Sequence, residues 1–271
     1  RILRNFLARD IILNIYNFKV HGSIKKNKTS YFLLKKCEFG DYHELNTIKK
    51  FSDKNKLLFI DCGCNYGFYS FYTASLSEKN LIFSIEASKD TSDEFIKNLN
   101  LNGFKNINFY NNAVSNTIDE TISFFESVND WESSQTHNNF NFFSELKVKS
   151  IKIDSLLKQY SLNDYNVIMK LDVEGNEINV IKGALEVIIK SEPLIIIEFS
   201  KYIFENKDNI DYLNYFLKKY DYSIYDTNYN KKNLENILEM LNNLQKRYKT
   251  IGNFYLIKNS SKNLKAFLSY E

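Results

Sequence analysis

The 271 residues carry 36 basic and 33 acidic side chains, and this near balance argues against a general binder of polyanions, whose basic residues should be in clear excess. Apolar residues make up 44% of the chain, enough for the core of one large domain or two small ones. No apolar run approaches the roughly 18 residues of a membrane span, and the N-terminus shows no signal-peptide pattern. The three cysteines, Cys37, Cys62 and Cys64, cannot form a disulfide framework in a chain of this size, which favours a reducing, cytoplasmic setting.

The opening stretch "RILRNFLARDIILNIYNF" has the pattern of an amphipathic helix that packs onto the domain. Short apolar runs then alternate with longer helical patterns, which indicates a parallel α/β sheet. We expect strands at residues 57–60, 81–85, 107–110, 167–171 and 194–199, with helices at 69–76, 89–101, 177–189 and 210–219. Residues 120–127 and 146–154 alternate apolar with polar and predict two strands beside a polar loop. A helix at 234–244 and a strand at 254–257 complete the pattern.

The domain organisation follows from the absence of any obvious linker. Pro193 is the single proline, and neither a Gly/Ser linker nor an internal repeat divides the sequence. We expect an N-terminal helical or strand extension at 1–52 that packs on the core, one main domain at 53–260 and a C-terminal tail at 261–271.

Four acids stand at or near the ends of four predicted strands: Asp61, Glu86, Asp172 and Glu198. The carboxyl ends of parallel strands meet at one edge, where ligands bind in open α/β sheets. A carboxylate buried there needs a partner, because leaving it unpaired is costly. One such acid could simply cap the following helix, but four in register predict a shared site.

The turn "DCGCNYG" after the first core strand places Gly63 and Gly67 four residues apart. Glycine lets the backbone bend tightly and lets a ligand approach closely. A dinucleotide fingerprint would need glycine at Asn65 and Phe68, and no Walker lysine follows, so this turn is poorly suited to a pyrophosphate. Glu86 lies about 20 residues beyond Gly67, where an acid usually binds ribose hydroxyls. A ribose site without a diphosphate signature fits S-adenosylmethionine and argues against a nicotinamide-dependent oxidoreductase.

These motifs carry a family resemblance. "FIDCGCNYGFYS", "SIEAS" and "NNAVSN" are similar to the first three motifs of class I S-adenosylmethionine-dependent methyltransferases. "VKSIKIDSLLKQY", "VIMKLDVEGNEINVIKGALEVI" and "PLIIIEFS" resemble the later half of the FkbM-type family, and K-L-D-V-E-G-N-E is the most specific run. The resemblance spans roughly residues 38–257. It implies a Rossmann-like class I fold, a seven-stranded, mostly parallel sheet with helices on both faces, and a cofactor-binding methyltransferase domain at 53–260.

Position by position, the resemblance implies a cofactor site along the first two strands. Gly63, Asn65 and Gly67 would line the methionine and adenosine portions of S-adenosylmethionine. Glu86 would hold both ribose hydroxyls. Asp61 would orient the first loop or meet the methionine amino group.

The adenine is expected between the second and third motifs. Ala87 would neighbour it on one side, and Asn112 with Ala113 would flank the other side. Upstream, "CEFGDYHE" resembles a segment that often covers the cofactor, which makes Tyr42 and Glu44 weaker candidates for cofactor binding.

Methyl transfer is an in-line displacement, so catalysis needs alignment and a usable nucleophile. A sugar hydroxyl reacts when a base removes its proton, and Asp172 is the first candidate because it ends a core strand beside the expected cofactor. Lys170, on the same strand face, would hold Asp172 ionised, or would only neutralise a buried charge. His137 in "WESSQTHNNF" is another candidate base, with a solvent-exposed loop histidine as the alternative. For Glu174, the sequence supports a structural and a catalytic role about equally.

A metal site is the less expected arrangement. Asp172, Glu174 and Glu198 would supply three oxygen ligands of the kind that Mg²⁺ prefers, but spacing alone shows no octahedral site. Cys62 and Cys64 form a C-x-C pair without a second pair, so we expect them to pack the turn and not to bind zinc.

The resemblance therefore implies an O-methyltransferase that acts on a sugar hydroxyl of a surface glycan or secondary metabolite. Two alternatives stay open: a module that binds the cofactor without catalysis, and a methyltransferase with a non-sugar acceptor. A DNA base methyltransferase is disfavoured because the single proline, Pro193, rules out its Pro-Pro-aromatic and Pro-Cys motifs. An RNA ribose methyltransferase would want a basic groove that the charge balance does not predict. The expected partner is thus a small molecule or glycan and not a nucleic acid.

Overall fold

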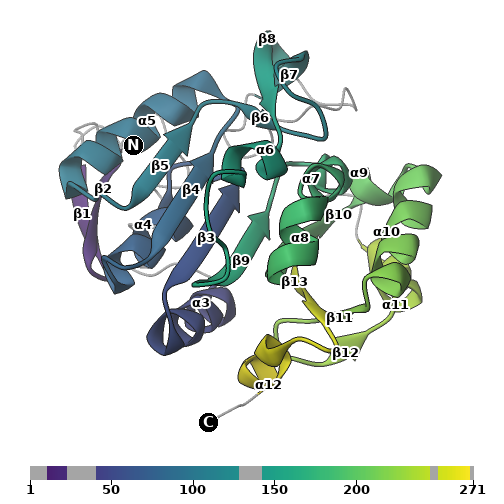
Figure 1. Ribbon diagram of the computed structural model, residues 1–271. Coiled ribbons are helices and arrows are strands. Elements are labelled where there is room, and N and C mark those ends of the chain that lie inside the picture. The colour runs from purple at the N-terminus through teal and green to yellow at the C-terminus, as the bar shows by residue number, and fades with distance from the viewer. Residues whose placement is uncertain (1–10, 23–40, 128–141, 245–249, 269–271) are drawn as a thin grey trace.

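The computed structural model describes residues 11–22, 41–127, 142–244 and 250–268, and its centre is a mixed sheet of eight strands (Figure 1). In spatial order the strands are β12 (Lys231–Lys232), β11 (Tyr222–Tyr225), β13 (Thr250–Lys258), β10 (Leu194–Ser200), β9 (Asn166–Leu171), β3 (Leu57–Cys62), β4 (Leu81–Ile85) and β5 (Ile107–Tyr110). The five strands from β10 to β5 are parallel, and β13 runs antiparallel between β10 and β11. The predicted α/β fold is confirmed. The expected strand number was too low by one, because the two-residue strand β12 pairs at the edge beside β11.

Helices cover both faces of this sheet (Figure 1). One face carries α3 (Tyr42–Lys54), α4 (Phe68–Leu76), α5 (Lys89–Asn102) and α12 (Lys262–Leu268). The other carries α6 (Ile153–Leu157), α7 (Glu177–Gly183), α8 (Leu185–Ser191), α9 (Lys201–Phe204), α10 (Lys207–Lys219) and α11 (Leu234–Asn242). Strands β3 and β9 are buried along their whole length, which explains their near-continuous apolar sequence. None of the described helices combines the length and apolar character of a membrane span.

The N-terminal part that is described forms a hairpin, so the amphipathic helix expected over the first 18 residues is wrong from residue 11 onward. Strands β1 (Ile11–Ile15) and β2 (Phe18–Gly22) pair antiparallel, and their side chains alternate between buried and exposed as a strand requires. The amides of Lys19 and His21 donate to the Oδ1 atoms of Asn102 and Asn98 on α5. This pairing with α5 satisfies backbone groups that a helix would have satisfied internally. Residues 1–10 lie outside the described part.

A small three-stranded sheet stands beside the carboxyl ends of the central strands: β6 (Ala113–Val114), β8 (Phe142–Ile151) and β7 (Thr121–Ser127). The strand expected at 146–154 ends at Ile151, and Asp154 belongs to α6 instead. The two carboxylate oxygens of Asp154 accept the amides of Glu186 and Val187. This cap starts a new helix, α8, and explains why the single helix expected at 177–189 is interrupted at Ala184.

Candidate active site

The strand order reverses between β3 and β9, and we call the sheet edge at the carboxyl ends of these strands the crevice. From β3 the chain continues through β4 to β5 on one side, whereas β9 and β10 lie on the other side. Ligands of open α/β sheets bind outside the carboxyl ends of the strands at such a reversal. Asp61, Glu86, Asp172 and Glu198 all lie at this edge, at the ends of β3, β4, β9 and β10.

The turn after β3 is shaped by close packing. Gly63 has φ +77°, and a Cβ there would lie 1.9 Å from the carbonyl oxygen of Asp172. Gly67 has φ +88°, and its Cβ would lie 2.5 Å from the Phe71 ring. Asn65 also adopts a positive φ, +50°. The first glycine therefore lets the two halves of the crevice touch, and the second lets the start of α4 approach its own aromatic side chains.

We expect Gly63→Ala to destabilise the fold far more than Gly103→Ala. Both glycines have positive φ, but a Cβ at Gly103 would meet nothing within 4 Å. The control should lose about 1–2 kcal/mol from backbone strain alone, and Gly63→Ala should lose about 1–3 kcal/mol more because its methyl group overlaps Asp172. Urea unfolding of both variants measures the difference. Equal losses would show that the contact between Gly63 and Asp172 is not tight.

Glu86 organises the loop after β4. Its two carboxylate oxygens accept the amides of Asn65 and Ser88, each at 2.9 Å, so one side chain links the first and second loops of the crevice. Burial raises the pKa of Glu86 to about 7. Asn111, which sequence reasoning missed, donates to the carbonyls of Glu86 and Ala87 and to Ser92 Oγ. Its place at the start of the "NNAVSN" motif was the available signal.

The residues expected around the adenine do come together. Ala113 and Val148 are buried in a small apolar cluster, and Ala87 and Ile122 pack against it. Asn112 turns its amide toward β8, where Nδ2 donates to the Lys149 carbonyl at 3.1 Å. Ala87 and Ala113 therefore border one apolar surface, while the side chain of Asn112 fastens the small sheet.

Asp61 is buried behind the first turn. Its Oδ2 accepts Ser70 Oγ at 2.6 Å, and Ser70 also contacts Ser84 Oγ at 2.7 Å. Its Oδ1 has no hydrogen-bond partner among the described residues. Burial raises the pKa of Asp61 to about 6, and Lys170 opposes that rise. Asp61 thus ties β3 to α4 and keeps one unused acceptor.

Lys170 and Asp172 form an ion pair at the centre of the edge. Lys170 Nζ lies 2.6 Å from Asp172 Oδ2, and the two side chains are 5% and 33% exposed. Burial alone would lower the pKa of Lys170, but Asp172, Asp61 and Glu198 raise it above its ordinary value. The lysine is therefore a fixed cation, and Asp172 is the partner that reaches solvent.

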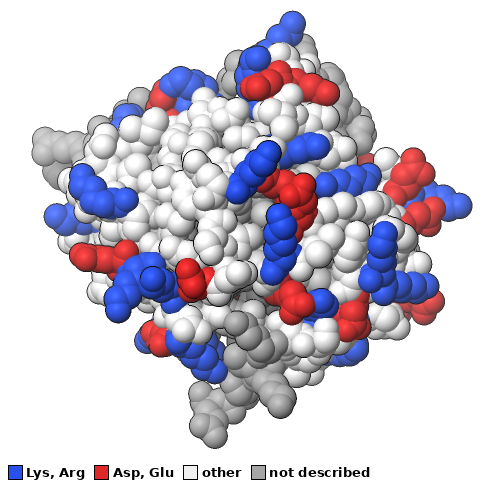
Figure 2. All heavy atoms as spheres, viewed as in Figure 1, with Lys and Arg blue, Asp and Glu red and all other residues white. Residues whose placement is uncertain are grey.

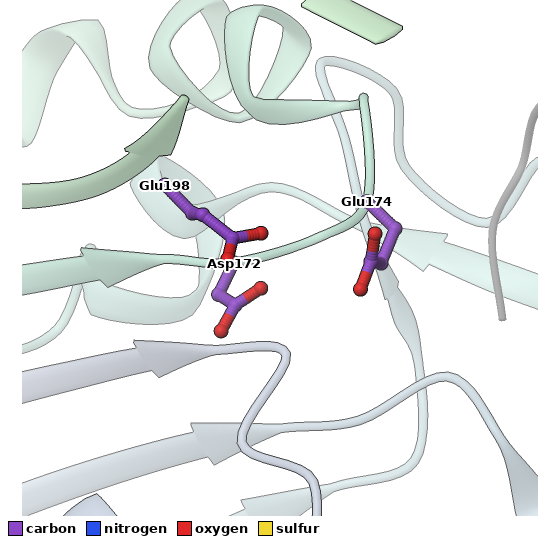
Figure 3. A group of neighbouring side chains, drawn as sticks. All are labelled: Asp172, Glu174 and Glu198. Carbon is purple, nitrogen blue, oxygen red and sulfur yellow. The ribbon is translucent and has the colours of Figure 1, made fainter. Parts of the chain in front are cut away.

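Glu174 and Glu198 bring two more carboxylates beside Asp172 (Figure 3). One ligand oxygen from each of the three acids lies within 4.8 Å of the others, a spacing that a hard cation could bridge. Burial and then Asp172 raise the pKa of Glu198 to about 8. Lys170 already supplies a positive charge to this group, which is why we expect no need for a metal.

For the activity that the family resemblance implies, removing divalent metal should leave turnover unchanged. The Lys170 ammonium sits 2.6 Å from Asp172 and does the charge balancing that Mg²⁺ would otherwise provide. Turnover after dialysis against EDTA, with and without added Mg²⁺, measures this. A loss that Mg²⁺ restores in the native chain but not in Glu174→Gln would show instead that the three carboxylates hold a metal.

The remaining sequence candidates are placed as follows. Glu44 is buried on α3 and its Oε1 accepts Asn253 Nδ2 at 2.9 Å, so its role in the structure is to join α3 to β13. Tyr42 is 67% exposed at the start of α3. His137 lies outside the described residues. Beside these candidates, Glu177 at the start of α7 accepts the amides of Val173 and Gly175 and so shapes the loop after β9.

A comparison with known protein families identifies the family of this chain. A family profile described as the methyltransferase FkbM domain matches residues 61–224, more than half of the chain. The chain belongs to the FkbM methyltransferase family. The matched range contains both crevice loops and the Lys170–Asp172 pair, and the FkbM resemblance seen in the sequence is confirmed. Residues 61–224 are therefore part of an S-adenosylmethionine-dependent methyltransferase domain.

Three solved structures are similar to this FkbM chain at low sequence identity. An FkbM methyltransferase from Methylobacillus flagellatus KT is 18% identical with a TM-score of 0.43, over 74% of this chain and 43% of that one. TYW2 from M. jannaschii, in complex with AdoMet, is 12% identical with a TM-score of 0.42, over 91% and 84% of the two chains. A putative rRNA-methylase from Clostridium thermocellum is 13% identical with a TM-score of 0.44, over 79% and 92%. The chain thus spans less than half the length of the Methylobacillus structure. A comparison with curated protein sequences gives no match.

Proposed function

We propose that this chain is an O-methyltransferase that methylates a hydroxyl of a sugar in a surface glycan or secondary metabolite, with Asp172 as the general base. The supporting observation is the position of Asp172. It follows β9 directly, packs its backbone on Gly63 of the first loop, and is 33% exposed while its partner Lys170 is buried. A carboxyl group that faces solvent beside the cofactor loops is placed to take a proton from an incoming hydroxyl.

The crevice fits S-adenosylmethionine in three features. Glu86 holds a carboxylate at the edge of the loops, where each oxygen can accept a ribose hydroxyl in addition to its present amide. Asp61, buried behind the first turn, accepts Ser70 Oγ and so fixes the start of α4 next to that loop. Ala87, which is partly exposed and packs on the buried Ala113, offers an apolar surface for the adenine. When bound, the cofactor supplies an electrophilic methyl group on a sulfonium.

The chain's own residues would then align the acceptor and move one proton. The acceptor hydroxyl would lie between the cofactor loops and Asp172, whose carboxylate takes the proton as the oxygen attacks. Lys170 holds the carboxylate by its 2.6 Å contact and keeps it oriented. Glu174 and Glu198, beside Asp172, would accept hydrogen bonds from neighbouring hydroxyls of a polyhydroxylated acceptor.

The same charges disfavour a nucleic-acid acceptor. Asp172 and Glu174 stand together at this edge, with Lys170 paired to Asp172, and their carboxylates would repel a phosphate backbone. On the face shown in Figure 2, basic and acidic side chains of the described residues are interspersed without an extended basic surface. A cytoplasmic setting is part of the proposal and rests on cysteine usage: Cys62 and Cys64 are buried free thiols.

The proposal is tested by an acceptor screen. The chain is incubated with methyl-labelled S-adenosylmethionine and a panel of neutral sugars, glycosides, catechols and short RNA, and labelled product is counted. Methyl transfer to sugars alone supports the proposal. Transfer to RNA or catechol and not to sugar would contradict it, and cofactor binding without transfer to any acceptor would favour the non-catalytic module.

Affinity for S-adenosylhomocysteine should rise as the pH increases through about 7. The raised pKa of Glu86 leaves its carboxyl largely protonated at pH 5.5 and ionised at pH 8, and the ionised form accepts both ribose hydroxyls. Calorimetric titrations at pH 5.5, 7 and 8 measure the trend. Glu86→Gln, which cannot ionise, is the matched control and should show no such rise; a parallel rise in both would assign the effect to another group.

A further inference from the structure

The buried side of Lys170 is in contact with an aromatic ring. Lys170 Nζ lies 4.8 Å from the centroid of the Tyr69 ring on α4, within the range of a cation–π interaction. Tyr69 is 6% exposed, and its hydroxyl donates to Asp41 Oδ2 at 2.7 Å. Lys170 of β9 thus contacts the face of the ring, and Asp41, which precedes α3, accepts its hydroxyl.

Several acids surround the Lys170 ammonium, and each of them attracts it electrostatically. Asp172 follows on its own strand, Asp61 faces it from β3, where the two residues are paired in register, and Glu198 approaches from β10. A lysine has three protons on a flexible stem, so its direction depends on what else surrounds the ammonium. The Tyr69 ring lies against the ammonium as an uncharged cation–π partner among these acids.

We propose that Tyr69 is a positioning residue for methyl transfer, because its ring face holds the Lys170 ammonium against Asp172. The inference rests on the proposed role of Asp172 as the base. Asp41 accepts the hydrogen bond of the Tyr69 hydroxyl and so fixes the ring. Donation to a carboxylate also makes the phenol ring more electron-rich, which strengthens the attraction of the ring for a cation. Without the ring, the ammonium would turn toward Asp61 or Glu198 and leave Asp172 unoriented.

The test keeps the shape of the ring and changes its electrostatics. Tyr69→Phe removes only the hydroxyl, and a phenylalanine with three ring fluorines at the same position has nearly the same shape but a weakened negative face. The first readout needs no acceptor: the rate at which formaldehyde and a borane methylate Lys170, followed by peptide mass spectrometry. Lys89, whose side chain is 62% exposed, is the internal reference.

Tyr69→Phe keeps an electron-rich ring face but loses the contact with Asp41, so Lys170 should be somewhat less protected than in the native chain, and this variant is the reference for the fluorinated ring. The fluorinated ring should speed labelling of Lys170 by about 2- to 30-fold, the range set by the strength of cation–π contacts, while Lys89 is unchanged. Equal rates for plain and fluorinated rings would overturn the inference. A merely structural ring would give that result, since the two rings fill the same space.

A second readout asks whether Tyr69 acts through Lys170. With a sugar acceptor from the screen, fluorination should lower kcat and leave KM unchanged, and this loss should disappear in a Lys170→Met background. A loss of kcat that persists in that background would overturn the inference. Turnover that survives in Asp172→Asn would instead contradict the proposed base, and the labelling rates would still report on the contact between Tyr69 and Lys170.

Discussion

Asp172→Asn should lose about 10²- to 10⁴-fold in turnover, the usual contribution of a general base, while its fold and its affinity for S-adenosylhomocysteine stay close to those of the native chain. The amide keeps the size of the side chain but cannot take a proton from the acceptor. The backbone of Asp172, which packs on Gly63, is unchanged by the substitution. Single-turnover assays with a sugar acceptor measure the loss, and calorimetry measures cofactor affinity.

A matched substitution separates this role from simple loss of charge. Glu174→Gln also removes one carboxylate of the same cluster, so a general effect of charge would appear in both variants. We expect Glu174→Gln to keep most of its turnover. Turnover that survives in Asp172→Asn would transfer the role of base to His137 or Glu174.

Glu86→Ala should weaken binding of S-adenosylhomocysteine by roughly 10²- to 10⁴-fold at pH 8. Two charge-assisted hydrogen bonds to the ribose would be lost, each worth about 1.5–3 kcal/mol. The carboxylate also accepts the amides of Asn65 and Ser88, so its removal loosens both loops of the crevice. Calorimetric titration measures the change in Kd.

The control for Glu86→Ala must keep the loops in place. Glu86→Gln retains one acceptor oxygen for a loop amide and should bind with an affinity between those of the native chain and the alanine variant. Asp93→Ala, on the surface of α5, changes an acid with no place in the crevice and should leave affinity unaltered. An unchanged Kd in Glu86→Ala would remove Glu86 from the ribose site.

Much of the fold could be predicted because the core strands are buried on both sides. β3, β9 and β10 read as apolar runs, and the acids at their ends mark the edge where the structure places the crevice. The N-terminal hairpin was mistaken for a helix because its polar contacts are made by Asn98 and Asn102, far away in the sequence. Contacts of that kind leave no local pattern.

In the candidate site, too, features with a local sequence pattern could be predicted, and features that depend on distant contacts could not. Spacing along one strand was enough to pair Lys170 with Asp172, and the position of Glu198 near the end of another strand placed it at the same edge. The sequence did not show why residue 63 must be glycine. The atom that leaves no room for a side chain there is the carbonyl oxygen of Asp172, more than a hundred residues later. Tyr69 was equally hidden, since its contact with Lys170 crosses from a helix to a strand.

A crystal structure with bound S-adenosylhomocysteine would test the central claim most directly. The account predicts that both ribose hydroxyls contact Glu86 and that the sulfur faces Asp172 across a gap wide enough for a methyl group and one acceptor oxygen. A sulfur atom directed away from Asp172, or a ribose that does not meet Glu86, would contradict the account.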